Sequence, residues 1–151
     1  MGNDGDDRPW LEVDRRPGST DDATVAAVGK LSEALEWVER ARGRLYDLHQ
    51  MSGHADLLIG EAVDDLEAAG HTEIAERLRA EIVGRNLIEG RWSFQIVEEY
   101  DATYWGPVRA AVFAVEDELM AGNRHVFESE MKEDRRTHGR RHHESRPDPG
   151  A

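Results

Sequence analysis

The sequence contains no cysteine, which excludes disulfide bonds, thiol catalysis and cysteine-ligated zinc. It also lacks long hydrophobic runs: no apolar stretch approaches the ~18 residues that a membrane-spanning helix requires. The opening residues, MGNDGDDRPW, have neither the basic nor the apolar region of a secretory signal peptide. We therefore expect a cytoplasmic protein that has no membrane partner.

Positive charge is scarce as well. The chain has 32 acidic and 19 basic side chains, a formal charge of −13, and residues 23–131 alone hold 21 acidic and 10 basic groups. Because nucleic-acid affinity depends on Lys and Arg that neutralise phosphates, the composition predicts no nucleic-acid partner. The acidic charge would suit a basic protein partner, although it can equally serve solubility alone.

Sequence motifs of catalysis and cofactor binding are missing. The chain has no GxSxG, Walker A, GxGxxG or HExxH motif. No histidine follows a glutamate by three residues, whereas a di-iron bundle requires that spacing on two helices. His54, Glu61 and Asp65 share a helical stripe, but Leu58 lies on it too, and a solvated face explains it more simply. No catalytic residue, metal ligand or cofactor is therefore assigned, and the sequence favours a non-enzymatic protein.

Composition divides the chain into three parts. Residues 1–19 are rich in Gly, Asp, Pro and Ser, which predicts a disordered acidic tail. Residues 20–136 carry apolar residues at helical spacing, which predicts the helical bundle domain. Residues 137–151, THGRRHHESRPDPGA, predict a disordered tail rich in His and Arg.

The middle part predicts several helices separated by glycines. The MSG sequence (51–53) predicts a break after the first helix, and Pro107 marks a break or restart further along. Pairing the apolar faces predicts an all-α fold, an antiparallel bundle of about four helices. The expected helical ranges are 20–50, 54–69, 72–89, 93–120 and 124–136.

Two polar residues interrupt the apolar stripe of the first expected helix. Arg42 and His49 stand where the spacing of Val28 and Leu35 predicts apolar residues. We expect them at the edge of the stripe, with side chains that reach water. A buried carboxylate partner for Arg42 is the alternative interpretation.

Aromatic residues gather in RWSFQIVEEYDATYWGP, residues 91–107, which holds five of the ten in the chain. On a helix, Ile96, Tyr100, Tyr104 and Val108 share one face, with Trp92 nearly in line, so the tyrosines can line the core. Glu98, Asp101 and Trp105 lie well off this face, so the two carboxylates are expected to face water. The stretch is therefore either a core seam or a binding surface, because Trp and Tyr are frequent interface anchors. The candidate binding residues are Trp92, Tyr100, Tyr104, Trp105, Glu98 and Asp101.

These features favour a small acidic helical protein that acts as a non-enzymatic interaction module, an adaptor or a regulator. The aromatic surface would bind a protein partner or a second copy, giving a homo-oligomer. The alternative is a helical bundle that binds a small molecule or a metal ion and could be an enzyme. Mimicry of nucleic acid by the acidic surface is a third hypothesis, which requires the carboxylates to form a row on one face.

Overall fold

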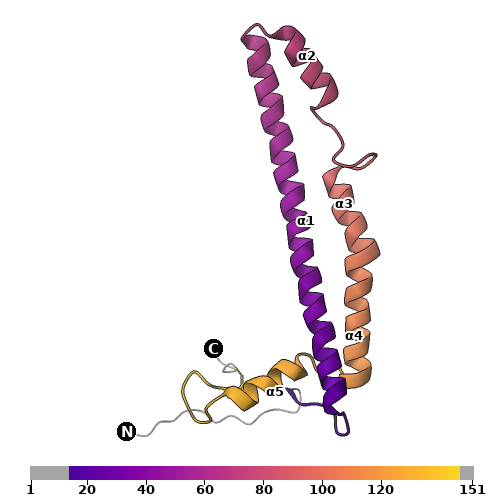
Figure 1. Ribbon diagram of the computed structural model, residues 1–151, viewed down its shortest axis with the longest axis vertical. Helices are drawn as coiled ribbons and strands as arrows, with labels where there is room; N and C mark the ends of the chain where they lie inside the picture. Colours follow the sequence, from indigo (N-terminus) through magenta and orange to yellow (C-terminus); the bar gives the residue numbers. More distant parts are fainter. Residues whose placement is uncertain (1–13, 147–151) are drawn as a thin grey trace. The chain divides into compact units, whose positions relative to one another are not determined.

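Every regular element that the structure describes is a helix (Figure 1). The structure is a computed structural model that describes residues 14–146. Within that range a single isolated bridge, between Ile88 and Arg91, is the nearest approach to a strand pair. The predicted all-α fold class is therefore confirmed. The elements are α1 (Asp22–Ala68), α2 (Thr72–Glu81), α3 (Ser93–Tyr100), the π-helical segment η2 (Asp101–Trp105), α4 (Gly106–Met120) and α5 (Val126–Arg135).

The predicted N-terminal tail falls largely, and the predicted C-terminal tail partly, outside the described residues. Residues 1–13 and 147–151 are not described, so the disorder expected there lies beyond what the structure tests. The described parts of the tails, residues 14–19 and 137–146, contain no α-helix. The boundaries expected for the helical domain, 20–136, stay a prediction.

Helix α1 runs without interruption through residues 51–53, so the predicted break there is wrong. An interior glycine such as Gly53 costs about 1 kcal/mol relative to alanine, which weakens a helix but does not end it. Tertiary contacts on both sides of the glycine hold the helix together. His49 contacts Ser93 before it, and Asp56 accepts a hydrogen bond from a backbone N–H group after it.

Helix α1 begins and ends where local sequence signals place its caps. At the start, Asp21 Oδ1 accepts a hydrogen bond of 2.7 Å from a backbone N–H group of the first turn. At the end, Gly70 adopts a φ of +92°, which costs little without a Cβ atom. The backbone N–H of His71 then reaches the carbonyl of Leu66 at 2.9 Å. This is the Schellman arrangement, which satisfies carbonyl groups of the last turn.

The chain divides into two compact units. The central unit is Val38–Pro107, and the terminal unit combines Met1–Trp37 with Val108–Ala151. Each unit has its own set of packed helices and its own polar contacts. The two are described in turn.

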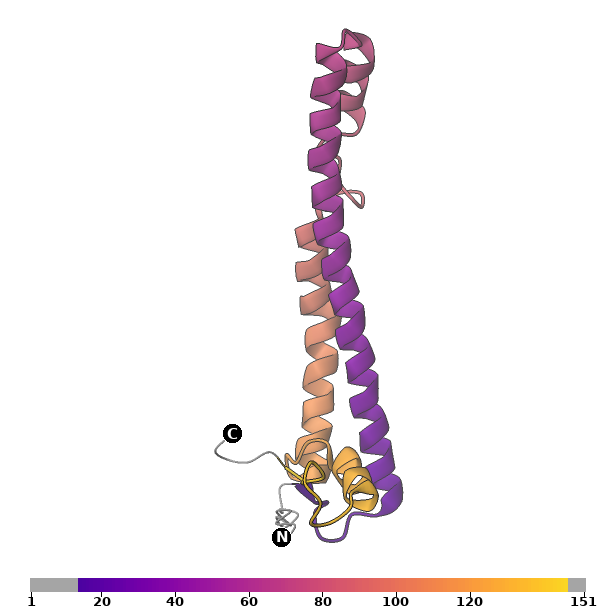
Figure 2. The same ribbon diagram turned by 90° about the vertical axis from the view of Figure 1, so that its left-hand side faces the viewer.

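The terminal unit packs the first turns of α1 against α4 and α5 (Figure 2). Val25, Val28, Met120 and Val126 form its buried apolar cluster. Val115 packs against this cluster from α4. The core is small, and it consists of aliphatic and methionine side chains.

A buried polar contact extends the same helix pair. Ser32 and Glu116 are both buried, and the Ser32 Oγ lies 3.0 Å from the Glu116 Oε1. Arg124 approaches the other carboxylate oxygen at 3.4 Å. Ser32 comes after the cluster residues of α1, whereas Glu116 comes before Met120 on α4. The order of these contacts is consistent with an antiparallel arrangement of α1 and α4 in this unit.

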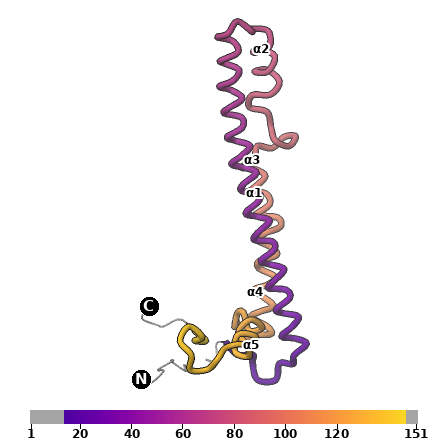
Figure 3. The backbone as a smooth tube through the Cα atoms, turned by 60° about the vertical axis from the view of Figure 1, so that its left-hand side comes forward, coloured from indigo at the N-terminus to yellow at the C-terminus, as the bar shows by residue number. Residues whose placement is uncertain are grey.

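In the central unit, α1 is joined by polar contacts to the segment that returns beside it (Figure 3). Residue numbers rise along α1 while those of its partners fall, so the two segments run antiparallel. The antiparallel packing that the sequence predicts agrees with this order in both units. The pairs are Glu39 with Trp105, Arg42 with Asp101, His49 with Ser93, and Asp56 with the backbone of Gly84.

Helix α2 lies beside the last turns of α1 in the same unit (Figure 1). Val63 and Ala75 are buried there. Arg79 donates hydrogen bonds to Asp64 at 3.0 Å and to Glu67 at 2.7 Å. The central unit therefore combines a small apolar core at α2 with a row of polar contacts between α1 and the return segment, residues 84–105.

Candidate functional site

The π-helical segment η2 sets the orientation of the aromatic stretch. The backbone N–H of Gly106 bonds to the carbonyl of Asp101, five residues earlier, so this turn holds one more residue than an α-helical turn. A Cβ atom at Gly106 would lie 2.9 Å from that carbonyl oxygen, which explains the glycine. Pro107 follows directly, and a proline ring inside a helix clashes with the carbonyl four residues earlier. The wide turn relieves that clash.

The face of this stretch that meets α1 differs from the predicted face. Val97 is buried, and Asp101 and Trp105 contact α1, at steps of four residues. Tyr100 is only half-buried and Tyr104 is exposed. The prediction that the tyrosines line the core while Asp101 faces water is therefore wrong.

Arg42 organises the inward side of the site. Its guanidinium donates from Nε to Asp101 Oδ1 at 2.7 Å and from Nη2 to Oδ2 at 2.9 Å. The same guanidinium lies 4.1 Å from the ring centroid of Trp105 and 5.1 Å from that of Tyr46. Such contacts combine charge-assisted hydrogen bonding with cation–π attraction. The alternative interpretation, a buried carboxylate partner for Arg42, is borne out in part: Asp101 is the partner, but both side chains are only half-buried.

Electrostatics follow from this geometry. The hydrogen bonds from Arg42 lower the pKa of the Asp101 carboxyl. Burial raises the pKa of the Tyr100 hydroxyl, and the neighbouring Tyr104 adds to the effect. Trp105 donates from Nε1 to Glu39 at 2.9 Å. Asp101 and Trp105 therefore have internal partners, which ties these two predicted site residues to the packing of the central unit.

The five aromatic residues separate into three contacts instead of forming one cluster. The rings of Trp92 and Phe94 meet edge to face, with centroids 6.0 Å apart. Those of Tyr100 and Tyr104 are tilted, with centroids 5.4 Å apart. Trp105 stacks on the arginine. Of the six predicted site residues, Trp92, Tyr104 and Glu98 present exposed side chains.

The loop that precedes α3 is the part of the site that sequence reasoning missed. It carries Leu87 and Ile88, both exposed, and Gly90 adopts a φ of +73°. The bond from the Arg91 N–H to the Ile88 carbonyl, at 2.9 Å, closes a tight turn around this glycine. With a positive φ at its third position, the turn is of type II. The sequence signal for this loop was the run Leu-Ile-Glu-Gly at residues 87–90. The predicted helix over residues 72–89 included the first three of these residues, whereas α2 ends at Glu81.

Further bonds hold the loop at both ends. The Gly84 N–H donates to Asp56 Oδ1 at 2.8 Å, and the Trp92 N–H donates to Gln95 Oε1 at 2.8 Å. Arg91 forms an ion pair with Glu99. The loop is thus anchored to α1 at one end and to α3 at the other.

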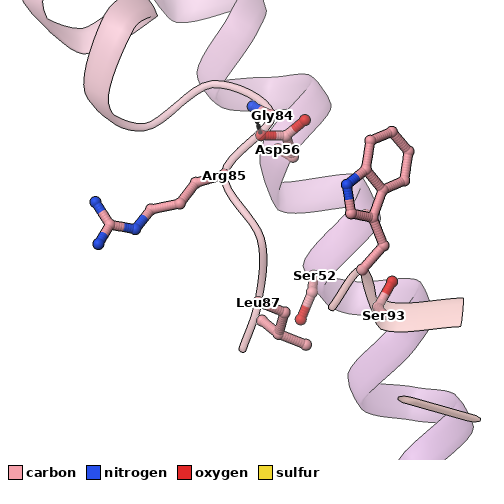
Figure 4. Close-up of a pocket in the computed structure, with 8 residues that line it drawn as sticks. Ser52, Asp56, Gly84, Arg85, Leu87 and Ser93 are labelled. Carbon is pink, nitrogen blue, oxygen red and sulfur yellow. Dashed lines mark hydrogen bonds between the residues drawn. The ribbon is translucent and has the colours of Figure 1, made fainter. Parts of the chain in front are cut away.

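A small cavity of about 200 Å³ lies between this loop and α1 (Figure 4). Leu87 and Ser52 point toward it, whereas the Arg85 side chain extends away. Drug-sized ligands usually occupy cavities of about 300–1,000 Å³, so this one suits a single side chain of a partner better than a whole small molecule. Its lining residues are Ser52, Gly53, Asp56, Gly84, Arg85, Leu87, Trp92 and Ser93.

A larger cavity, of about 570 Å³, lies in the terminal unit. Both acidic and basic side chains line it, including those of Glu128, Arg124 and Lys132. Asp14 and Arg146, which also line it, already form an ion pair with each other. The cavity offers no large apolar side chain as an anchor, so it is a weaker candidate than the loop.

Comparisons with known proteins find nothing similar. No family model matches the chain, and no curated protein or solved structure matches it significantly. Among residues 14–146, no three His, Asp or Glu side chains are grouped so that they could hold a metal ion. No helix of the same range is both long and apolar enough to cross a membrane.

Proposed function

We propose that the protein is a non-enzymatic interaction module that binds a protein partner on the loop surface, defined as Leu87, Ile88, Trp92 and Phe94. The observation that carries this proposal is the exposure of these four large apolar side chains, which lies between 41% and 60%. Contiguous exposed apolar side chains are typical of interaction sites. Tryptophan is the residue type most often found as an energetic anchor.

The loop surface is held in place before any partner arrives. The type II turn at Gly90 and the anchors at Asp56 and Gln95 restrict the loop backbone. A binding loop that is already ordered loses less conformational entropy on association. This distinguishes the loop surface from an exposed apolar segment that merely lacks a place in the core.

The chemistry of the site indicates what kind of partner it would bind. Residues 38–107 carry 14 acidic and 7 basic side chains, so the surroundings attract positive charge. The cavity beside Trp92 has room for one apolar side chain. We therefore propose a partner segment that presents an aliphatic or aromatic anchor flanked by Lys or Arg.

The remaining predicted residues have a supporting role in this proposal. Glu98 and Tyr104 have exposed side chains that are accessible to a partner. Asp101 and Trp105, through Arg42, hold the return segment against α1. They would therefore position the loop surface without touching the partner.

The test is capture of partners by the intact chain and by matched tryptophan variants. Trp92 and Trp37 are each 60% exposed, but only Trp92 belongs to the loop surface. We expect Trp92→Ala to lose, and Trp37→Ala to retain, the partners that the wild-type chain captures after crosslinking. Equal capture by wild type and Trp92→Ala would contradict the proposal.

A further inference from the structure

We propose that two copies of the chain pair antiparallel through an outer stripe on α1, independently of the loop surface. Within the central unit, α1 meets its return segment through Arg42, His49 and Asp56, which are spaced by sevens. A second apolar series runs along another face of α1, and every one of its members is exposed. The outer stripe consists of Ala41, Leu48, Met51, Ala55, Leu58 and Ala62.

The spacing of the outer stripe is that of a helix-pairing seam. From Leu48 onward its members alternate at three and four residues, as the a and d positions of a coiled coil do. The side chains of Leu48, Met51 and Leu58 are between 44% and 64% exposed. An isolated amphipathic helix normally presents polar residues on the face away from its packing seam. The stripe therefore has the composition of a face that another helix covers.

Charges beside the stripe change sign along its length. Arg40 and Arg44 lie along its first half, together with Asp47, and Glu61 and Asp65 lie along its second half; Arg44 and Asp65 stand at positions of the stripe's own three-and-four spacing. Arg44 and Glu61 are equally distant in sequence from the midpoint between residues 52 and 53, and so are Arg40 and Asp65. An antiparallel copy would bring opposite charges together, whereas a parallel copy would bring like charges together.

This symmetry is the reason for choosing a second copy as the occupant. In a two-fold symmetric interface each residue i contacts residue j of the partner while j contacts i, so the surface must complement its own reversal. The charge pairs are symmetric about the midpoint of residues 52 and 53, and half a residue away, about residue 53, Leu48 mirrors Leu58 and Met51 mirrors Ala55. The Arg44–Asp47 bridge within the chain is exposed, so it opposes this pairing only weakly.

The size of the stripe indicates the strength of the pairing. From Ala41 to Ala62 the helix is about 32 Å long at 1.5 Å per residue. One such contact buries less than the roughly 800 Å² per partner of a standard interface. We therefore expect a dimer in the micromolar range that dissociates on dilution.

The first test is sedimentation equilibrium of the full chain as a function of concentration. Leu57 and Leu58 are neighbours and are 67% and 49% exposed, but only Leu58 lies on the outer stripe. We expect Leu58→Glu to raise the dimer Kd by roughly tenfold or more, and Leu57→Glu to leave it near the wild-type value. Far-UV circular dichroism checks that both variants keep their helices.

A charge exchange tests the antiparallel arrangement itself. Arg44→Glu alone and Glu61→Arg alone should each weaken the dimer, because each creates like-charge contacts across the interface. The double variant should recover affinity, because both contacts are again between opposite charges. A wild-type chain that stays monomeric at millimolar concentration would overturn the proposal. So would equal effects of the two leucine variants, or a double variant no better than the singles. Loss of partner capture in Trp92→Ala bears only on the loop surface.

Discussion

Gly29 provides the sharpest test of packing in the terminal unit. It lies buried in α1, where a Cβ atom would come within 2.7 Å of the Phe127 Cβ and 2.8 Å of its Cγ. Both atoms sit at the base of the phenylalanine side chain, so no rotation of the ring can move them away. Gly29→Ala therefore requires α5 to shift from α1.

Two effects of opposite sign determine the outcome of Gly29→Ala. Alanine is favoured over glycine inside a helix by about 1 kcal/mol. Overpacking of a well-fitted contact costs typically about 1–3 kcal/mol. We expect the clash to prevail, giving a net loss of about 0–2 kcal/mol. Gly43→Ala, in the same helix with nothing within 4 Å of the new Cβ, should gain about 0.5–1 kcal/mol instead.

Thermal unfolding followed by circular dichroism at the helical band measures this difference. For a chain of this size about 1 kcal/mol corresponds to about 2–4 °C in Tm. Gly43→Ala should raise Tm by a few degrees, and Gly29→Ala should lower it or leave it unchanged. Adding Phe127→Gly to Gly29→Ala should remove the clash, because glycine has neither the Cβ nor the Cγ atom. If Gly29→Ala raised Tm as much as Gly43→Ala does, the close contact of α1 with α5 would be refuted.

Two further predictions concern the central unit. Because Arg42 lowers the pKa of Asp101, the ionised carboxylate contributes stability above its ordinary pKa of about 4, and this contribution is lost as pH falls through the lowered value. Asp101→Asn should therefore lower Tm at pH 7, and its difference from wild type should shrink below about pH 4; a difference independent of pH would contradict this. Gly90→Ala forces a side chain into a positive φ at a cost of about 1–2 kcal/mol, which should distort the loop. Helical circular dichroism should be kept while partner capture falls; undiminished capture would show that the turn does not position Trp92.

The sequence predicts the class of fold because helical periodicity and capping residues are local signals. Asp21 at the start of α1 and Gly70 after its end are residue types that favour helix caps, and both act as caps in the structure. The continuity of α1 through Gly53 is not a local property. It depends on contacts with Ser93 and Gly84, which are distant in sequence. The helix propensities of residues 51–53 could not reveal these distant partners.

The orientation of the aromatic stretch could be predicted only in part, for two physical reasons. The contact of Ser93 with His49 places positions 93 and 97 toward α1. This face is displaced by one residue from the predicted face, which begins at Ile96. The π-helical turn then inserts an extra residue, which a constant period of 3.6 does not allow for. Pro107 predicts a break or restart of the helix, but its effect on the direction of the side chains depends on three-dimensional packing.

The distribution of polar residues on α1 links the architecture to assembly. Within the central unit the inward seam carries Arg42, His49 and Asp56, each with a partner, while Leu48 and Leu58 face outward. Polar groups at seam positions fix register and orientation but contribute less stability than apolar side chains would. Exposed apolar side chains, in turn, gain free energy only when another surface covers them. Helix α1 buries Val63 but leaves Leu48, Met51 and Leu58 exposed, so the hydrophobic free energy of these three side chains is the driving force that the proposed pairing would use.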